Sequence, residues 1–479
     1  MRPRRVAGLV SLLAAAASLA AGALFAPTAG AAPFETGLTD PVFESADAAE
    51  RNLWLDRASQ ANASTLLMGA AWGGIAPSSP GPAFEATDPG DPAYNWGTLD
   101  ASIRDAAAKG LEPMLLVTGA PLWAEGRNRP SQEKAPLGSW KPDPKALGEF
   151  GEAIARRYSG TYVNPADPGA GPLPRVRRFQ LWAEPNLSVY LTPQYIGKKP
   201  FAPGHYRLML RSFYEGVHKA VGSDLVVTGG TAPYGDPGRG GERTQPVRFW
   251  RELLCLKGSE KLKKTKCKAP AKFDVWAHNP INVGQPRRNA INRDDASTPD
   301  LARIGRVVNK AVKSGTALPR KRKPVYATEL WWDSNPPDEK GIPEKKHARW
   351  LAEGFYVLWK QGAERVYWFQ IRDPASSGDD AAVTQSGLYL RNGKPKLAER
   401  AFAFPFATDR AGKGPVQVWG VSPQSGKVAI ERKVGKVWRR AGSARAKRDG
   451  VFTDRVRARQ GDTFRARIGG DASVPFTVK

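Results

Sequence analysis

The sequence predicts an α/β fold, a (β/α)8 TIM barrel followed by a small C-terminal β-sandwich domain of immunoglobulin-like outline. Two observations lead to this prediction. From residue 34 to residue 405, short apolar runs alternate with segments of helical periodicity, as in a barrel. From residue 414 onward the pattern changes to short alternating strands separated by turn residues. We therefore expect a barrel domain over residues 33–405 and an all-β accessory domain over residues 414–479.

Eight apolar runs are the strand candidates of the barrel. In these runs, apolar residues occupy both the odd and the even positions, which is typical of parallel strands buried on both faces. A doubly wound open sheet is the alternative fold, but it requires a glycine fingerprint after the first strand, and the sequence has none there. The eight runs are residues 36–43, 66–72, 113–119, 176–182, 224–230, 273–279, 324–330 and 365–371.

The N-terminus has the organisation of a secretory signal peptide. Arg2, Arg4 and Arg5 precede an apolar tract over residues 6–26, and small residues follow up to Ala32. This order predicts a signal peptide over residues 1–32 and a protein that is secreted or associated with the cell surface. An uncleaved membrane anchor is the alternative, since the apolar tract is long. We expect no membrane span in the chain after signal cleavage.

The chain has only two cysteines, Cys255 and Cys267. In an exported protein the two thiols are candidates for one disulfide across the lysine-rich loop between them. Metal binding is the poorer alternative because no histidine lies near them in the sequence. We expect neither a metal nor another cofactor.

The chain of 479 residues has a formal net charge of +26. Such an excess favours anionic neighbours, and it leans towards an anionic cell-wall polymer or a glycan that contains uronic acids. The basic residues are scattered, and no nucleic-acid-binding motif accompanies them, so we expect no nucleic-acid partner. The C-terminal domain is expected either to bind carbohydrate or to act as a spacer.

Two glutamates follow strand candidates on what becomes the same rim of the barrel. Glu184 follows the fourth candidate and Glu329 ends the seventh. Catalytic groups of such barrels lie where strands end and loops begin. A pair of carboxyl groups there suits glycoside hydrolysis, in which one donates a proton to the leaving oxygen and the other attacks the anomeric carbon.

The motifs WAEPNL and ATELWW around these glutamates resemble the clan-A retaining glycoside hydrolases, and within them family 39, which contains β-xylosidases and α-L-iduronidases. The resemblance implies a carbohydrate substrate, with Glu184 as acid/base and Glu329 as nucleophile. It also places a histidine after strand six and a tryptophan on strand eight, where the indole forms the floor below a sugar ring. The substrate-binding candidates are Trp72, Trp123, Asn186, His278, Asn279, Trp332 and Trp368.

The sequence departs from the family pattern at three places. Ala183 stands where the family has an asparagine before the acid/base glutamate, and Pro280 replaces a tyrosine after strand six. The arginine expected near strand two is missing as well. Asn186 or Asn279 could replace the missing amide. The departures motivate an alternative function, a catalytically impaired barrel that binds polysaccharide at the cell surface.

Overall fold

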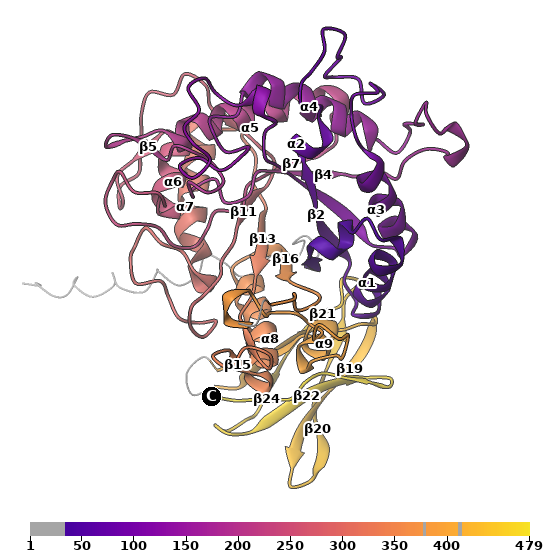
Figure 1. Ribbon diagram of the computed structural model, residues 1–479. Coiled ribbons are helices and arrows are strands. Elements are labelled where there is room, and N and C mark those ends of the chain that lie inside the picture. The colour runs from indigo at the N-terminus through magenta and orange to yellow at the C-terminus, as the bar shows by residue number, and fades with distance from the viewer. Residues whose placement is uncertain (1–33, 377–379, 411–413) are drawn as a thin grey trace, which may run out of the picture.

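The computed structural model describes residues 34–376, 380–410 and 414–479 (Figure 1). The predicted signal peptide lies outside the described residues. Within them, no helix is long and apolar enough to cross a membrane.

Eight parallel strands form the barrel, and the fold-class prediction is confirmed. Each strand pairs with its neighbour in chain order, and the last strand, β16, pairs with the first, β1. Single bridges between residues 227 and 275 and between residues 231 and 278 join β7 to β11 and complete the ring. The strands are β1 (Glu35–Thr39), β2 (Thr65–Ala71), β3 (Glu112–Thr118), β4 (Arg178–Leu181), β7 (Leu225–Thr228), β11 (Trp276–His278), β13 (Val325–Leu330) and β16 (Ala363–Phe369).

Helices pack around the outside of the barrel (Figure 1). Their ends carry the expected capping residues: Asp143 accepts hydrogen bonds from two backbone N–H groups of α4, and Gly315 ends α7 with a φ of 71°. The helices are α1 (Ala48–Gln60), α2 (Trp72–Ile75), α3 (Gly97–Ala108), α4 (Pro144–Arg157), α5 (Ala202–Ala220), α6 (Pro246–Leu253), α7 (Leu301–Ser314), α8 (Glu344–Lys360) and α9 (Leu397–Ala403).

Alternation along the strands divides the side chains into two layers. On β16, Arg365 and Tyr367 point into the barrel, whereas Val366 and Trp368 point outward into the helix layer. The inner layer is small and contains Leu67, Met114, Val227, Val275, Ala277, Tyr326 and Tyr367. The large outer layer extends without a break into the C-terminal domain.

Two-residue strands and short 3-10 helices lie in the loops of the barrel. Each of the short strands pairs only with one other short strand. They are β5 (Tyr195–Ile196), β6 (Lys199–Pro200), β8 (Leu256–Lys257), β9 (Lys263–Lys264), β10 (Ala271–Lys272), β12 (Ala317–Leu318), β14 (Ser334–Asn335) and β15 (Ile342–Pro343), together with the 3-10 helices η1 (Pro41–Glu44), η2 (Leu122–Ala124), η3 (Pro168–Ala170), η4 (Thr298–Asp300) and η5 (Asp380–Ala382).

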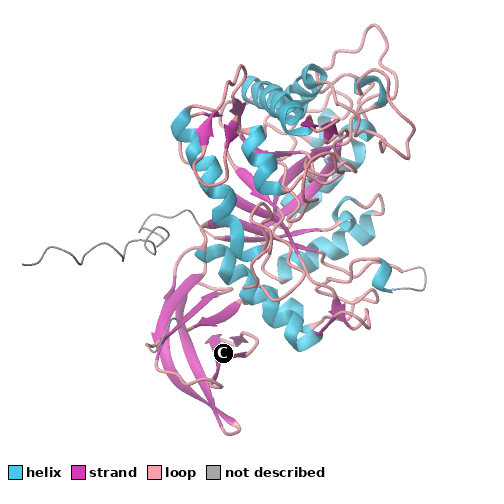
Figure 2. Cartoon of the chain, turned by 90° about the vertical axis from the view of Figure 1, so that its left-hand side faces the viewer, coloured by secondary structure: helices cyan, strands magenta, loops and turns pink. Residues whose placement is uncertain are grey.

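The C-terminal residues form two antiparallel sheets beside the barrel (Figure 2). Trp419 on β18 (Val416–Val421) packs against Phe34, Tyr356 and Trp359 and so joins the domain to the barrel. The first strand of these two sheets, β17, lies before residue 414, the position at which this domain is expected to begin from the sequence. One sheet contains β17 (Phe406–Asp409), β18 (Val416–Val421) and β21 (Val451–Val456), and the other contains β19 (Gly426–Val434), β20 (Val437–Ala446), β22 (Thr463–Ile468), β23 (Asp471–Ala472) and β24 (Phe476–Thr477).

Cys255 and Cys267 form a disulfide, with their Cα atoms 5.7 Å apart. The prediction of a staple is therefore confirmed. The bridge closes the loop that contains the short β8–β9 hairpin, directly after α6.

Candidate active site

Two strands deliver the predicted glutamates to the same end of the barrel. Glu329 lies on β13, and Glu184 follows β4 in a turn where Trp182 and Glu184 both adopt positive φ, 72° and 31°. This backbone conformation is uncommon for residues other than glycine and is concentrated at functional sites. The Glu184 N–H donates to the carbonyl oxygen of Gly230 at 3.1 Å, which fixes the turn against the end of β7.

Asn279 connects the two carboxyl groups. Its Nδ2 donates to Glu184 Oε1 at 3.1 Å and to Glu329 Oε2 at 3.3 Å. Its own Oδ1 accepts a hydrogen bond of 2.8 Å from the Thr328 hydroxyl, and this bond fixes which way the amide faces. Gly230 makes room for the arrangement, because a Cβ there would lie only 2.1 Å from Asn279 Oδ1. The predicted residues Glu184, Asn279 and Glu329 are thus brought together.

Burial raises the pKa of both glutamates above the ordinary carboxyl range, and the charge of Glu329 raises that of Glu184 further. Glu329 has an additional donor, since Trp331 Nε1–H bonds its Oε1 at 2.8 Å. This hydrogen bond lowers the pKa of Glu329 and favours its ionised form. Of the two groups, Glu329 is therefore the better placed to carry a charge, and Glu184 the better placed to hold a proton.

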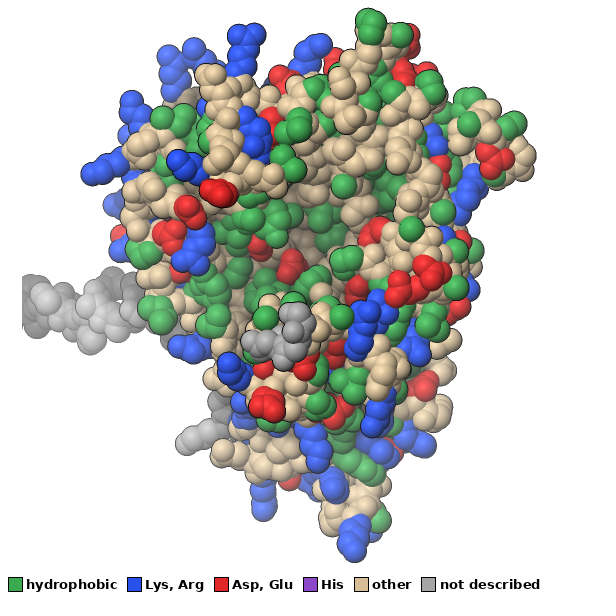
Figure 3. All heavy atoms as spheres, in the orientation of Figure 1, with side chains coloured by type: hydrophobic (Ala, Val, Ile, Leu, Met, Phe, Trp, Pro, Cys, Tyr) green, Lys and Arg blue, Asp and Glu red, His purple; other side chains and the backbone are tan. Residues whose placement is uncertain are grey.

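A cavity of about 330 Å³ opens over Glu329 and Asn279 at the carboxyl ends of the strands. In the space-filling view, the barrel face is hollowed at its centre, with apolar and acidic side chains on the floor and most basic side chains around the outside (Figure 3). Within the described residues, no group of three or more histidine, cysteine, aspartate and glutamate side chains could hold a metal ion. The lining residues are Thr39, Asp40, Pro41, Glu44, Leu67, Gly69, Leu116, Gln180, Ala183, Tyr190, Asn279, Thr328, Glu329 and Phe369.

The aromatic residue that reaches this cavity from β16 is Phe369 and not Trp368. Trp368 is completely buried on the outer side of the strand, where it packs against His347 and Phe355 of α8 and its indole N–H donates to the Ser386 carbonyl. The physical reason is the strand alternation, which turns neighbouring side chains to opposite faces. Tyr190 adds a second ring to the cavity, and Trp182 Nε1–H fixes its backbone by donating to the Tyr190 carbonyl.

Three other predicted residues lie in the protein interior instead of the cavity. Trp72 follows β2 on its outer side, is only 1% exposed and stacks on Phe150 of α4. Trp332 is buried against Trp350 and donates to the Gly284 carbonyl. His278 is fully buried between the Thr231 hydroxyl and the Ala296 carbonyl, and burial lowers its pKa to about 4, so it is neutral.

The remaining two predicted residues support loops near the site. Asn186 is fully buried, and its amide donates to the carbonyl oxygens of Ala232 and Thr244. Trp123 is partly buried and donates to the Pro77 carbonyl. Neither side chain lines the cavity over Glu329.

Several of the lining residues were not predicted from the sequence, among them Glu44, Tyr190, Phe369 and Thr328. A signal for Glu44 was present, because this acid directly follows the first strand candidate, as Glu184 follows the fourth. No comparable signal marks Tyr190, which lies in the loop after β4 and reaches the cavity only through the course of the chain.

Comparison with solved structures finds the same fold in glycoside hydrolases. A family 39 glycoside hydrolase from Bacteroides cellulosilyticus WH2 superposes with a TM-score of 0.52 and 14% identity over 89% of this chain and 79% of that one. The family 39 enzyme from Xanthomonas axonopodis pv. citri gives the same TM-score and identity over 90% and 94% of the two chains. The chain has the fold of these glycoside hydrolases. Its sequence matches no protein-family model and no curated protein.

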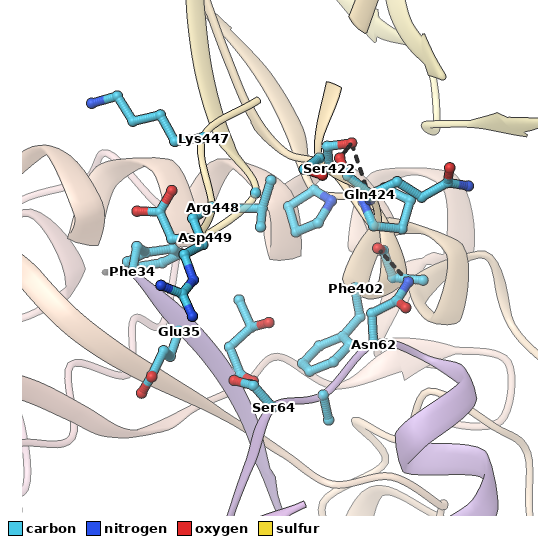
Figure 4. Close-up of a pocket in the computed structure, with 18 of the residues that line it drawn as sticks. Phe34, Glu35, Asn62, Ser64, Phe402, Ser422, Gln424, Lys447, Arg448 and Asp449 are labelled. Carbon is cyan, nitrogen blue, oxygen red and sulfur yellow. Dashed lines mark hydrogen bonds between the residues drawn. The ribbon is translucent and has the colours of Figure 1, made fainter. Parts of the chain in front are cut away.

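A larger hollow of about 780 Å³ lies at the other end of this glycoside-hydrolase fold, between the start of β1 and the C-terminal domain (Figure 4). Glu35 and Asp449 are its acidic residues, and Glu35 pairs with Arg365 inside the barrel. In this fold the N-terminal ends of the strands serve stability, whereas chemistry takes place at the carboxyl ends. The smaller cavity over Glu329 is therefore the candidate active site.

Proposed function

We propose that the protein is an exported glycoside hydrolase that cleaves O-glycosidic bonds of an oligosaccharide or polysaccharide with retention of anomeric configuration. The observation that carries the proposal is the sharing of one Asn279 amide nitrogen by Glu184 and Glu329. Because Glu184 Oε1 and Glu329 Oε2 accept from the same nitrogen, the distance between them cannot exceed the combined length of these two hydrogen bonds. That limit favours a retaining pair, whose carboxyl groups are ~5–5.5 Å apart, over an inverting pair at ~6.5–9.5 Å.

The first step forms a bond between a Glu329 oxygen and the anomeric carbon while the bond from that carbon to the leaving oxygen breaks. Glu184 gives its proton to the leaving oxygen and becomes a carboxylate. Charge develops on the sugar in the transition state, next to a Glu329 carboxylate that Trp331 and Asn279 have already oriented.

In the second step the Glu184 carboxylate takes a proton from water, and the water oxygen attacks the anomeric carbon. The glycosyl ester bond breaks, Glu329 leaves as a carboxylate and Glu184 is protonated again. The raised pKa of Glu184 suits this double use, because a group that is acid and then base works best with a pKa near the working pH.

A panel of aryl glycosides tests the proposal. We expect hydrolysis of at least one substrate, with the first-formed sugar keeping its anomeric configuration in NMR spectra recorded during turnover. Glu329→Gln should abolish turnover. Glu184→Gln should slow it most for poor leaving groups, since these depend on proton donation. Inversion, or full activity of Glu329→Gln, would refute the proposal, and Glu260→Gln on the exposed disulfide loop is the matched control.

Export is part of the proposal and is supported by the N-terminal sequence and by the disulfide. N-terminal sequencing of protein recovered from the culture medium tests it, with cleavage expected near Ala32. A protein that keeps residues 1–32 and sediments with membranes would contradict it.

We also propose that the basic surface retains the exported protein on anionic cell-wall polymer. Exposed cations gather near the end of the β19–β20 hairpin, namely Lys433, Lys436, Arg439 and Arg440. Replacing these four residues by glutamine should reduce salt-sensitive retention on a polyanion resin without changing turnover of a small aryl glycoside. Unchanged retention would show that the hairpin does not bind the polyanion.

A further inference from the structure

Two neighbouring loops at the rim of the candidate active site carry exposed apolar side chains. Leu122 and Leu137 belong to the loop after β3, and Val189 and Tyr190 belong to the loop after β4. These four residues, the rim patch, are between 41% and 59% exposed. Figure 3 shows hydrophobic side chains around the central hollow. Single exposed apolar residues are common on protein surfaces, so only a contiguous group indicates a binding site.

Backbone hydrogen bonds bring the members of the rim patch together. The Ala120 N–H donates to the Gly138 carbonyl at 3.1 Å, so the segments that carry the two leucines lie side by side. The Thr192 N–H donates to the Ser139 carbonyl at 2.8 Å, and the Lys141 N–H donates to the Thr192 carbonyl at 3.0 Å. These two bonds join the loop after β3 to the loop after β4, which carries the other two members of the patch just before Thr192.

Hydrogen bonds also fix the backbone below the rim patch. Glu125 Oε1 accepts from the Trp140 N–H at 2.8 Å, while the other oxygen of Glu125 pairs with Arg129. In the second loop, the Trp182 indole N–H donates to the Tyr190 carbonyl at 2.7 Å. A surface that is already ordered loses less conformational entropy when a ligand binds to it.

Tyr190 connects the rim patch to the catalytic cavity, because it belongs to the patch and also lines that cavity. The patch lies on the side of Glu184, since Glu184 follows β4 and the patch follows β4 and its neighbour β3. In the proposed reaction, Glu184 gives its proton to the leaving oxygen. The leaving group is therefore the part of the substrate nearest to the patch.

We propose that the rim patch is an aglycone subsite that binds an apolar leaving group, an alkyl or lipid-like chain attached to the sugar. The inference rests on the proposed glycosidase function and narrows it to the bond between an oligosaccharide and such a group. Each methylene of the chain that leaves water on the patch increases affinity by up to roughly fourfold. A sugar in the same place would bury hydroxyl groups against leucine and valine side chains, which cannot hydrogen-bond them.

A series of para-alkylphenyl glycosides tests the inference, with the sugar that is turned over best in the aryl glycoside panel. Phenol, para-butylphenol and para-hexylphenol are leaving groups of nearly equal reactivity, so differences within the series report binding of the alkyl chain. We expect kcat/KM to rise by at least roughly tenfold from the phenyl to the para-hexylphenyl glycoside, mainly through a lower KM, at concentrations below micelle formation. Equal values along the series would overturn the inference.

A triple variant tests the rim patch itself. It combines Leu122→Ser, Leu137→Ser and Val189→Ser and leaves Tyr190 in place. The ratio of kcat/KM between the para-hexylphenyl and the phenyl glycoside should fall to less than roughly threefold, because the alkyl chain loses the apolar surface that it covers. A ratio that stays at the value of the parent chain would overturn the inference and leave the proposed function intact.

The matched control removes the same kinds of side chain from exposed positions away from the rim. It combines Leu53→Ser on α1, Leu208→Ser on α5 and Val163→Ser in the loop between α4 and β4, where these side chains are 41% to 49% exposed. The control should keep the ratio of the parent chain. Thermal unfolding curves show that both triple variants fold. If both variants lower the ratio equally, the gain does not come from the rim patch and the inference fails.

Vesicles of phosphatidylcholine test a membrane surface as the other apolar occupant of the rim patch. We expect the parent chain to remain in the supernatant when these vesicles are sedimented. Sedimentation that the triple variant of the patch abolishes, together with no gain along the alkyl series, would assign the patch to membrane docking and overturn the inference.

If no glycoside is turned over, the proposed function fails and binding alone decides the inference. Titration calorimetry of the Glu329→Gln variant should then give a Kd at least roughly tenfold lower for the para-hexylphenyl than for the phenyl glycoside of one sugar in the panel. The triple variant of the rim patch, added to Glu329→Gln, should remove this difference. Equal Kd values for the two glycosides, or no binding of either, would refute the inference.

Discussion

Glu184 and Glu329 accept hydrogen bonds from the same amide nitrogen, at 3.1 and 3.3 Å, although Glu184 follows β4 and Glu329 lies on β13. The donor is Asn279 at the end of β11. In the resembling family an asparagine next to the acid/base glutamate supplies an amide to this region, and Ala183 occupies that position here. The amide therefore reaches the two carboxyl groups from a different strand, and both depend on one side chain for their orientation.

The first prediction concerns Trp331→Phe, which removes the indole N–H that donates to Glu329. That hydrogen bond favours the ionised carboxylate, so its loss raises the pKa of Glu329 further. Since the nucleophile must be ionised, the acidic limb of the kcat/KM profile should move to higher pH by roughly one unit. The profile measured for Trp438→Phe, on the C-terminal hairpin, should match that of the parent chain. An unmoved acidic limb would contradict the assignment of Glu329.

The second prediction concerns stability in alkaline solution. Burial raises the pKa of Glu44 to about 8. The unfolded chain loses this proton near an ordinary glutamate pKa of ~4.3, so between these pH values the folded state binds more protons and stability falls as pH rises. Glu44→Gln removes the dependence. Between these two pH values, the free energy of unfolding of Glu44→Gln should rise relative to that of the parent chain by at most ~1.4 kcal/mol per pH unit.

Urea unfolding at pH 5, 7 and 9 measures this difference. The parent and Glu44→Gln should be closest at pH 5 and farthest apart at pH 9. Glu260 is exposed, so Glu260→Gln should show the pH dependence of the parent. If the difference in unfolding free energy between Glu44→Gln and the parent becomes smaller as the pH rises, Glu44 is ionised in the folded protein over this range.

The strand order and the two glutamates could be predicted from the sequence because both depend on local signals. Each strand is a short apolar run, and each glutamate follows or ends one of these runs. Closure of a barrel then places the carboxyl ends of all strands on one rim, however far apart they lie in the chain. The pairing of Glu184 with Glu329 could therefore be predicted from the positions of their strands in the chain, the fourth and the seventh.

The direction of each side chain could not be predicted in the same way. Parallel barrel strands are apolar on both faces, so the pattern does not distinguish the inside of the barrel from the helix layer. Trp368 and Phe369 are both aromatic neighbours on β16, yet only Phe369 reaches the cavity. The same difficulty affected Trp72, which begins α2 directly after β2 and packs in the helix layer, and His278, which lies on the outer side of β11.

The third prediction tests this correction at Trp72. The indole is buried on Phe150 and Trp123 in the helix layer. Trp72→Ala should lower the free energy of unfolding by about 3–5 kcal/mol because it leaves a large cavity. At a temperature where the variant remains folded, KM should stay within about twofold of the parent value, since the side chain contacts no substrate. A raised KM with unchanged stability would place Trp72 in the sugar cleft after all.

The fourth prediction separates the two asparagines that could replace the missing family amide. Asn279→Ala removes the donor shared by Glu184 and Glu329, and the loss of one oriented donor of this kind costs ~10²–10³-fold in kcat. Stability should fall less than in a variant whose side chain is enclosed by protein on all sides, because Asn279 lines the cavity and water there can bond the groups that lose the amide. Single-turnover kinetics on an aryl glycoside, combined with urea unfolding, measures both quantities.

Asn186→Ala is the matched comparison, because this side chain is near Glu184 in the chain but bonds only backbone groups of Ala232 and Thr244. Its removal leaves buried backbone groups without partners, which costs roughly 1–3 kcal/mol for each group, so stability should fall. Its kcat should remain far above that of Asn279→Ala under conditions where the variant is folded. The reverse pattern, with kcat lost in Asn186→Ala and retained in Asn279→Ala, would show that the amide needed for catalysis comes from the loop after β4.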